Sequence, residues 1–149
     1  MGGPKWYHKV AGHTDNKHVP VGDKVTVNGV TGEILRNIDD PDGSHSRMPS
    51  YSGESDMYFR LDSDGKTVIQ GTLYIGHKKI CDFDWGHEHK NTDGKKFPKG
   101  VVHVQFYEAD SNGNRVRANN GDARYMNNGE MKKYGPIIRY FNPDAKFRP

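Results

Sequence analysis

Residues 57–65 read MYFRLDSDG, and this stretch decides the fold. Met57, Phe59 and Leu61 alternate with more polar side chains, which is the two-residue period of a strand with one apolar face. The segment Ser63–Gly65 is rich in turn-forming residues and predicts a tight turn. A return strand over about residues 66–75 completes a hairpin, so this stretch indicates an antiparallel sheet.

The same alternation predicts further strands on both sides of this hairpin. Residues 24–30 and 32–36 form one pair, joined at the Asn28-Gly29 turn signal. Residues 80–85 and 101–107 follow the central hairpin. The connections between these strands are short, which favours an antiparallel meander.

The remaining segments are expected to be loops and short helices. Residues 1–21 form an irregular N-terminal arm and residues 37–55 a long polar loop, because turn formers interrupt both periodicities there. Helical patterns are confined to residues 129–134 and, with a weaker signal, 122–127. The apolar residues 137–141 are expected to dock on the sheet. The predicted class is therefore α+β with β dominant: a twisted antiparallel sheet with short helices and long polar loops.

Composition indicates a single compact domain over residues 1–149, which is the usual size for one hydrophobic core. The lone cysteine, Cys81, excludes an internal disulfide, so packing alone holds the fold together. The formal net charge of +3 at pH 7 suits a polyanionic partner. No apolar run approaches the ~20 residues that span a bilayer. Residues 1–5 are not followed by the apolar segment that a signal peptide needs. We therefore expect secretion or delivery, if any, as part of a larger protein.

Strand parity sorts the side chains of each predicted strand into a core face and an open face. In residues 101–107 Val102 and Val104 are apolar, so His103 points to the other side. A histidine that transfers protons near neutral pH and a fixed arginine are the groups that cleave a phosphodiester without a metal, and tyrosines stack on bases. The alternative is the ordinary solvated face of an amphipathic sheet. The predicted open face carries His103, Arg60, Tyr58, Tyr74 and Gln105.

A second group of polar residues lies in the segment 82–89, DFDWGHEH. Carboxylates and imidazoles at this spacing bind zinc or another divalent metal ion. Two aspartates and two histidines of this segment converge on one ion only if the chain bends in a particular way at Gly86. A single histidine, by contrast, reaches the open face through a loop alone. We therefore expect acid–base chemistry without a cofactor and keep a divalent metal site as the alternative. Its ligands would be Asp82, Asp84, His87 and His89.

Four lysines follow this segment, at positions 90, 95, 96 and 99. Lysines beside a catalytic face attract the phosphates of a nucleic acid, and we expect Lys95 and Lys96 to bind substrate. The alternative is a solvated hairpin loop.

Several short stretches resemble the C-terminal toxin domains of bacterial polymorphic toxins of the contact-dependent inhibition and Rhs/YD-repeat type. These stretches are YFRLDSDGK at 58–66, ICDFD at 80–84, GHEH at 86–89, the Phe97-Pro98 pair, and His103. The resemblance implies a nuclease cargo domain that enters a neighbouring cell, often a ribonuclease with a barnase-like sheet and helix, and a cognate immunity protein that blocks it. It also implies site residues, which are Arg60, Asp82, Asp84, His87, His89 and His103.

The function expected from these observations is a cytotoxic, metal-independent ribonuclease that acts on RNA in the cytoplasm of the target cell. His103 and either His87 or His89 would share the general base and acid roles, and Arg60 would stabilise charge on the scissile phosphate. The 2′-hydroxyl would be the nucleophile, which leaves a cyclic phosphate. The alternatives are a metal-dependent nuclease and a non-enzymatic binding module of a phage or surface assembly.

Overall fold

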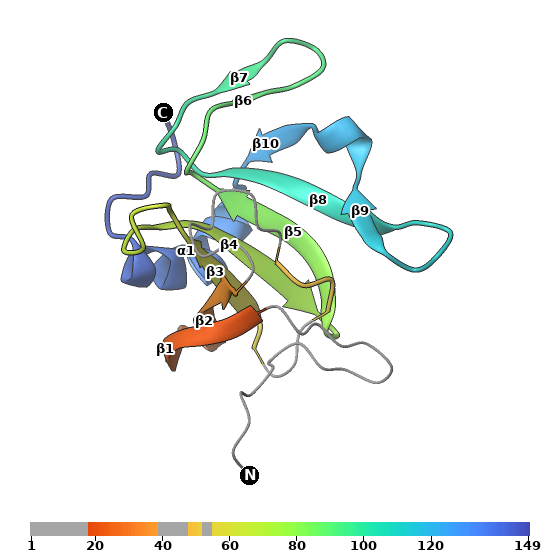
Figure 1. Cartoon of the computed structure of the whole chain (residues 1–149). Helices are drawn as coiled ribbons and strands as arrows, with labels where there is room; N and C mark the ends of the chain where they lie inside the picture. Colours follow the sequence, from red (N-terminus) through yellow and green to blue (C-terminus); the bar gives the residue numbers. More distant parts are fainter. Residues whose placement is uncertain (1–17, 39–47, 52–54) are drawn as a thin grey trace.

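The computed structural model describes residues 18–38, 48–51 and 55–149 (Figure 1). Strands dominate these residues, and one α-helix follows them near the C-terminus. The predicted α+β class with dominant β-structure is therefore confirmed. In chain order the elements are β1 (His18–Val27), β2 (Val30–Asn37), β3 (Met57–Leu61), β4 (Val68–Ile75), β5 (Lys78–Asp84), β6 (His89–Lys90), β7 (Lys96–Phe97), β8 (His103–Ala109), β9 (Arg115–Arg117), the 3₁₀ helix η1 (Asn119–Gly121), β10 (Ala123–Tyr125) and α1 (Asn128–Phe141).

The main sheet has eight strands in the order β1-β2-β3-β4-β5-β8-β10, and β9 pairs with β8 beside this path (Figure 1). Every pairing is antiparallel except that of β2 with β3, which is parallel. The sheet is therefore mixed, and the prediction of a purely antiparallel sheet is wrong at this position. A parallel pair needs a crossover of a dozen or more residues, and residues 38–56 provide that length.

The first hairpin has the predicted turn. Asn28 and Gly29 both have positive φ angles, 53° and 76°, as a two-residue type I′ turn requires. β1 begins earlier than predicted, at His18, because His18 pairs with Asn37 at the end of β2. The predicted arm is thus too long by residues 18–21, and its first 17 residues lie outside the described part. Most of the predicted loop 37–55 lies outside it as well.

The helix α1 is longer than the predicted residues 129–134. A capping box between Asn127 and Glu130 begins it, and it continues through Pro136 to Phe141. Proline lacks an N–H and leaves the carbonyl four residues earlier without its helical donor. That carbonyl, of Lys132, instead accepts a 3.1 Å hydrogen bond from Asn28 Nδ2 of the first hairpin.

Residues 122–127 do not form the second short helix that the pattern suggested. They contain β10, in which Tyr125 pairs with His103 of β8. In the described residues α1 follows the sheet in the chain, and this order gives no support to a barnase-like arrangement with a leading helix. No helix in the described part is long and apolar enough to cross a membrane.

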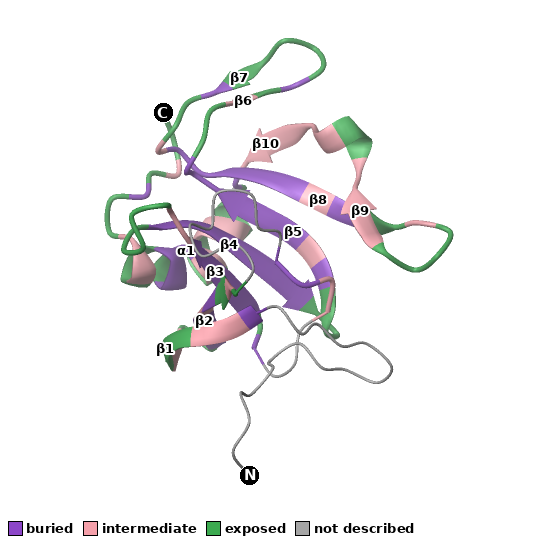
Figure 2. Cartoon of the chain, in the orientation of Figure 1, coloured by how far each residue is buried: buried purple, intermediate pink, exposed green. Residues whose placement is uncertain are grey.

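The hydrophobic core lies between α1 and one face of the sheet, and the central strands are the most buried (Figure 2). Phe59 and Phe83 from the sheet contact Phe141 and Tyr134 of the helix, with ring centroids 4.3 and 5.5 Å apart. Ile137 is fully buried against them. Because α1 covers the apolar face, the polar side chains of the same strands lie on the opposite face.

Candidate functional site

The opposite face carries a row of polar side chains that crosses the sheet. The register pairs Arg60 with Gln70, Gln70 with Asp84, and Asp84 with His103. A neighbouring row contains Tyr58, Thr72, Asp82 and Gln105. Strand parity thus places His103, Arg60, Tyr58 and Gln105 on one face as predicted. The expectation that this face is open is wrong, because all four side chains are buried, at 0–8% exposure. A bulge between Leu73 and Tyr74 shifts the end of β4, and Ile75, which the alternation assigned to the core, is 58% exposed.

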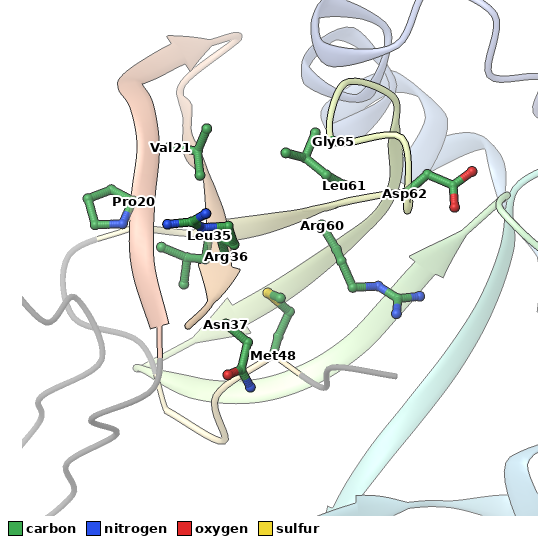
Figure 3. Close-up of a pocket in the computed structure, with 10 residues that line it drawn as sticks. All are labelled: Pro20, Val21, Leu35, Arg36, Asn37, Met48, Arg60, Leu61, Asp62 and Gly65. Atoms are coloured by element: carbon green, nitrogen blue, oxygen red, sulfur yellow. The ribbon is translucent and has the colours of Figure 1, made fainter. Parts of the chain in front are cut away.

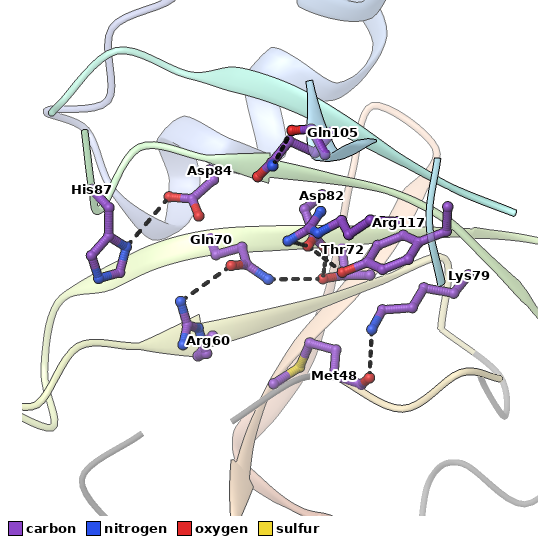
Figure 4. Close-up of polar contacts among 12 residues, drawn as sticks. Met48, Arg60, Gln70, Thr72, Lys79, Asp82, Asp84, His87, Gln105 and Arg117 are labelled. Carbon is purple, nitrogen blue, oxygen red and sulfur yellow. Dashed lines mark hydrogen bonds and ion pairs between the residues drawn. The ribbon is translucent and has the colours of Figure 1, made fainter. Parts of the chain in front are cut away.

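Hydrogen bonds join several of these side chains into one polar chain across the sheet (Figure 4). Arg60 Nη2 donates to Gln70 Oε1 at 3.2 Å, and Gln70 Nε2 donates to Thr72 Oγ1 at 3.3 Å. The Thr72 hydroxyl donates to Asp82 Oδ1 at 2.6 Å. The other carboxylate oxygen of Asp82 accepts from the Tyr107 hydroxyl and lies 2.9 Å from Arg117 Nη2. Asp82 is 1% exposed and its charge is compensated within the fold, which is the arrangement of a structural carboxylate.

The sequence interpretation missed most of the polar chain. Gln70 and Thr72 alternate with Ile69, Gly71 and Leu73, so the parity argument applied to β4 would have found them. Arg117 had no comparable signal, because β9 is only three residues long and reaches Asp82 through its pairing with β8.

Asp84 lies at the end of β5 and forms a pair with His87. The Gly86 amide donates to Asp84 Oδ1 at 2.9 Å, and His87 Nδ1 is 3.9 Å from the same oxygen (Figure 4). The two side chains differ in exposure, at 11% for Asp84 and 56% for His87. The turn that joins them is fixed, since Trp85 Nε1 donates to the Val68 carbonyl at 3.0 Å. An exposed imidazole therefore stands beside a nearly buried carboxylate, at a separation longer than a hydrogen bond.

His103 is on the predicted face, but it is not open to solvent. Its ring is 1% exposed and stacks on His89 with centroids 5.3 Å apart and planes 20° apart. Phe97 lies 5.7 Å from it. Burial lowers the pKa of His103 below its ordinary value, although Asp84 acts in the opposite direction. His89 and Phe97, at the base of the β6–β7 hairpin, cover this histidine, so the expectation of an exposed His103 is corrected.

The β6–β7 hairpin projects from the body of the molecule (Figure 1). Lys90 and Lys96 lie directly opposite each other in its ladder. Among the described residues, no carboxylate forms an ion pair with Lys90, Lys95, Lys96 or Lys99. Like charges directly opposite each other destabilise a ladder. A hollow of about 490 Å³ lies between these lysines and is lined by Glu88, His89, Lys90, Lys96, Phe97 and Pro98.

The other predicted binding residues have structural contacts. Tyr58 and Tyr74 are 0% and 3% exposed and pack edge to face against each other in a small core with Leu35 and Met48. Neither ring presents a free face to a base. Gln105 Nε2 donates to the Gly121 carbonyl at 2.7 Å and holds the η1 turn.

The four residues of the alternative metal site do not converge. Asp82 belongs to the polar chain, Asp84 pairs with His87, and His89 stacks on His103. Within the described ranges no three His, Cys, Asp or Glu side chains come together as metal ligands would.

Arg60 lies nearer to the Asp84–His87 pair than to His103. β4 and β5 separate β3 from β8, so Arg60 and His103 are about 14 Å apart along their row, whereas Arg60 and Asp84 are about 10 Å apart. Arg60, Gln70 and Asp84 lie in the row with His87 beside Asp84, and His103 ends the row, where His89 stacks on it.

Comparisons with known proteins gave no relatives: no protein-family model, no curated protein and no solved structure matches this chain.

Proposed function

We propose that this domain cleaves RNA without a metal, and that the Asp84–His87 pair is its acid–base centre. The observation that carries the proposal is the exposed His87 ring, with Nδ1 3.9 Å from the nearly buried Asp84. In this pair the carboxylate orients the ring, and the other ring nitrogen remains available to substrate. Catalytic hydrogen bonds are often long or poorly aligned before substrate binds, and we expect this separation to shorten in the complex.

The reaction moves two protons. A base takes the proton from the 2′-hydroxyl as that oxygen attacks phosphorus, and an acid gives a proton to the 5′-oxygen as the P–O bond breaks, which leaves a 2′,3′-cyclic phosphate. His87 supplies one of these groups. His89, which is half-buried and two residues away, supplies the other through Nδ1, since its Nε2 is enclosed. His103 is buried and acts as a positioning residue by stacking on His89.

Charge supports a polyanionic substrate. Arg60, joined to Gln70 in the row of Asp84, supplies a cation for the scissile phosphate. The β6–β7 hairpin starts two residues after His87, and its lysines, Lys95 and Lys96 among them, form no ion pair within the described residues. They attract the phosphates next to the scissile one.

The direct test uses the purified full chain with total RNA and with plasmid DNA, each with and without EDTA. RNA is expected to be cut in both conditions, with cyclic phosphate ends. His87→Gln is expected to reduce the rate on the order of 10²-fold or more. The matched control is His77→Asn, which changes an exposed histidine in the β4–β5 turn and leaves the rate unchanged.

Asp84→Asn keeps an acceptor for the Gly86 amide and removes the negative charge. It is expected to lower the rate less than His87→Gln, because the imidazole stays in place and loses only its anionic neighbour. Loss of cleavage with EDTA would favour the metal-dependent alternative. Absence of cleavage from intact protein would favour a binding module.

The resemblance to polymorphic toxins extends the proposal to the cell: the domain is delivered as part of a larger protein, cuts RNA in the target cytoplasm, and is blocked by an immunity protein. Cytoplasmic expression of the chain in bacteria is expected to stop growth, and expression of His87→Gln is not. Equal growth inhibition by both proteins would show that the toxicity does not come from this centre.

A further inference from the structure

A second hollow, of about 400 Å³, lies at the other end of the polar row (Figure 3). Strands β1 and β2 form one side of it, and the end of β3 with its following turn forms the other (Figure 3). Its apolar lining comes from five side chains, of which Leu35 and Met48 are buried and Val21 is 36% exposed. The apolar residues are Pro20, Val21, Leu35, Met48 and Leu61.

Two arginines, Arg36 and Arg60, also line this hollow. Arg60 is 8% exposed and begins the polar chain through Gln70. Arg36 is exposed, and in the described part of the chain it forms no ion pair or side-chain hydrogen bond. The carboxylate of Asp62, at the same rim, accepts from the Ser63 amide. The hollow therefore combines an apolar floor and the buried guanidinium of Arg60 with the exposed guanidinium of Arg36 and the carboxylate of Asp62 at its rim.

We infer that this hollow holds one unstacked base of single-stranded RNA, with Arg36 and Arg60 on its phosphate or stacked on its ring. The inference rests on the proposed function. Pockets of this size with an apolar lining and few polar groups are typical of small-molecule sites, and guanidinium planes stack on bases. A base reaches such a hollow only after it leaves a helical stack, so the substrate is single-stranded.

The position of the hollow indicates the path of the RNA across the sheet. Arg60 connects the hollow to Gln70 and then to Asp84, about 10 Å away across β4. The RNA backbone therefore crosses the strands, with one base in the hollow, the scissile phosphate near His87, and the next phosphates at the lysines of the β6–β7 hairpin.

The test measures binding separately from cleavage. Every protein carries His87→Gln, and the probe is a fluorescent 12-nucleotide single-stranded RNA, with a duplex of the same sequence for comparison. Val21→Trp places a large side chain in the hollow from a partly exposed position. It is expected to raise the Kd for the single strand about tenfold. Tyr140→Trp, at an exposed position on α1, is the matched control and leaves the Kd unchanged.

Arg36→Glu gives a second variant at an exposed position, which guards against misfolding of the first. It is also expected to weaken binding of the single strand about tenfold. Thermal unfolding confirms that each variant is folded.

The outcomes separate the two proposals. In one outcome the wild-type protein cuts no RNA, but the single-stranded RNA binds and both hollow variants weaken this binding. The proposed function then fails and the base site stands. If folded Val21→Trp and Arg36→Glu bind the single strand as the parent does, or if the duplex binds as well as the single strand, the base site is wrong whatever the activity.

Discussion

His103 is the residue whose surroundings differ most from an ordinary position on a sheet surface. It is held between His89, Phe97 and the end of β5, and its Nδ1 is buried with no hydrogen-bond partner in the described residues. A buried imidazole in this setting is more stable when neutral, which is why its pKa is lowered.

This residue predicts a pH dependence of stability. The pKa of His103 in the folded chain lies below the ordinary value of 6.5 that applies in the unfolded chain. Between these two values the unfolded state binds more protons, so the free energy of unfolding falls as pH falls below 6.5. Urea unfolding at several pH values from 7.5 to 5 measures the effect. His103→Phe keeps a ring in the stack and is expected to flatten the curve over this window, whereas His77→Asn keeps the wild-type slope. Parallel curves for wild type and His103→Phe would show that His103 is not the responsible group.

At the scale of elements, the pairing of β6 with β7 is destabilised by repulsion between two lysines. Lys90 and Lys96 face each other across it, and Lys95 Nζ lies 5.2 and 5.3 Å from the rings of Phe97 and Tyr125. The hairpin is held to the body by Asn91, whose side chain bonds to both backbone groups of Ala123, and by Thr92 with Asp122. The repulsion is therefore tolerated in a short element that other contacts fix in place.

The double variant Lys90→Gln/Lys96→Gln is expected to weaken RNA binding and, at the same time, to stabilise the protein slightly. Two lost phosphate contacts lower the slope of log K against log salt by about 1.4 for a single strand. Removal of the facing charges raises the free energy of unfolding by roughly 0.2–1 kcal/mol. Filter binding at several salt concentrations and urea unfolding measure the two effects. Lys132→Gln/Lys133→Gln removes the same charge from α1, on the other side of the sheet, and leaves the salt slope unchanged. An unchanged slope in the hairpin variant would remove these lysines from the RNA path.

At the scale of the whole molecule, the distance between α1 and the sheet is set by residues without side chains. A Cβ on Gly32 would lie 2.9 Å from both Ile137 Cδ1 and the Phe59 ring, and a Cβ on Gly71 would lie 2.7 Å from the same ring. These contacts are too short for real carbon atoms. α1 therefore packs directly over bare backbone of β2 at Gly32, whereas Gly71 of β4 leaves room for the Phe59 ring of the neighbouring strand.

Gly32→Ala is expected to destabilise the protein by about 1–3 kcal/mol, because the added methyl group separates the helix from the sheet. The matched control is Gly129→Ala in the first turn of α1, where the nearest atom is 3.5 Å away. This change is expected to stabilise the protein by roughly 0.5–1 kcal/mol, since alanine has the better helix propensity. Urea unfolding measures both. A neutral Gly32→Ala would mean that the helix moves without loss of packing.

The sequence by itself determined the features that depend on neighbours along the chain. Alternation identified β3, β4, β5 and β8 and placed Arg60 and His103 on the face opposite Phe59 and Val104, because side-chain direction in a strand has a fixed period of two. The Asn28-Gly29 turn followed in the same way from the backbone preferences of two residues.

Only the tertiary structure decided the features that depend on distant contacts. The parallel pairing of β2 with β3 comes from a long crossover, and the helix continues through Pro136 beside an Asn28 side chain that donates to the freed carbonyl. His103 is buried because His89 and Phe97 of the β6–β7 hairpin pack on it, and Asp82 is structural because Arg117 and Tyr107 reach it from other strands. Local periodicity fixes the direction of a side chain, whereas its burial and partners depend on segments that pack against it from elsewhere in the chain.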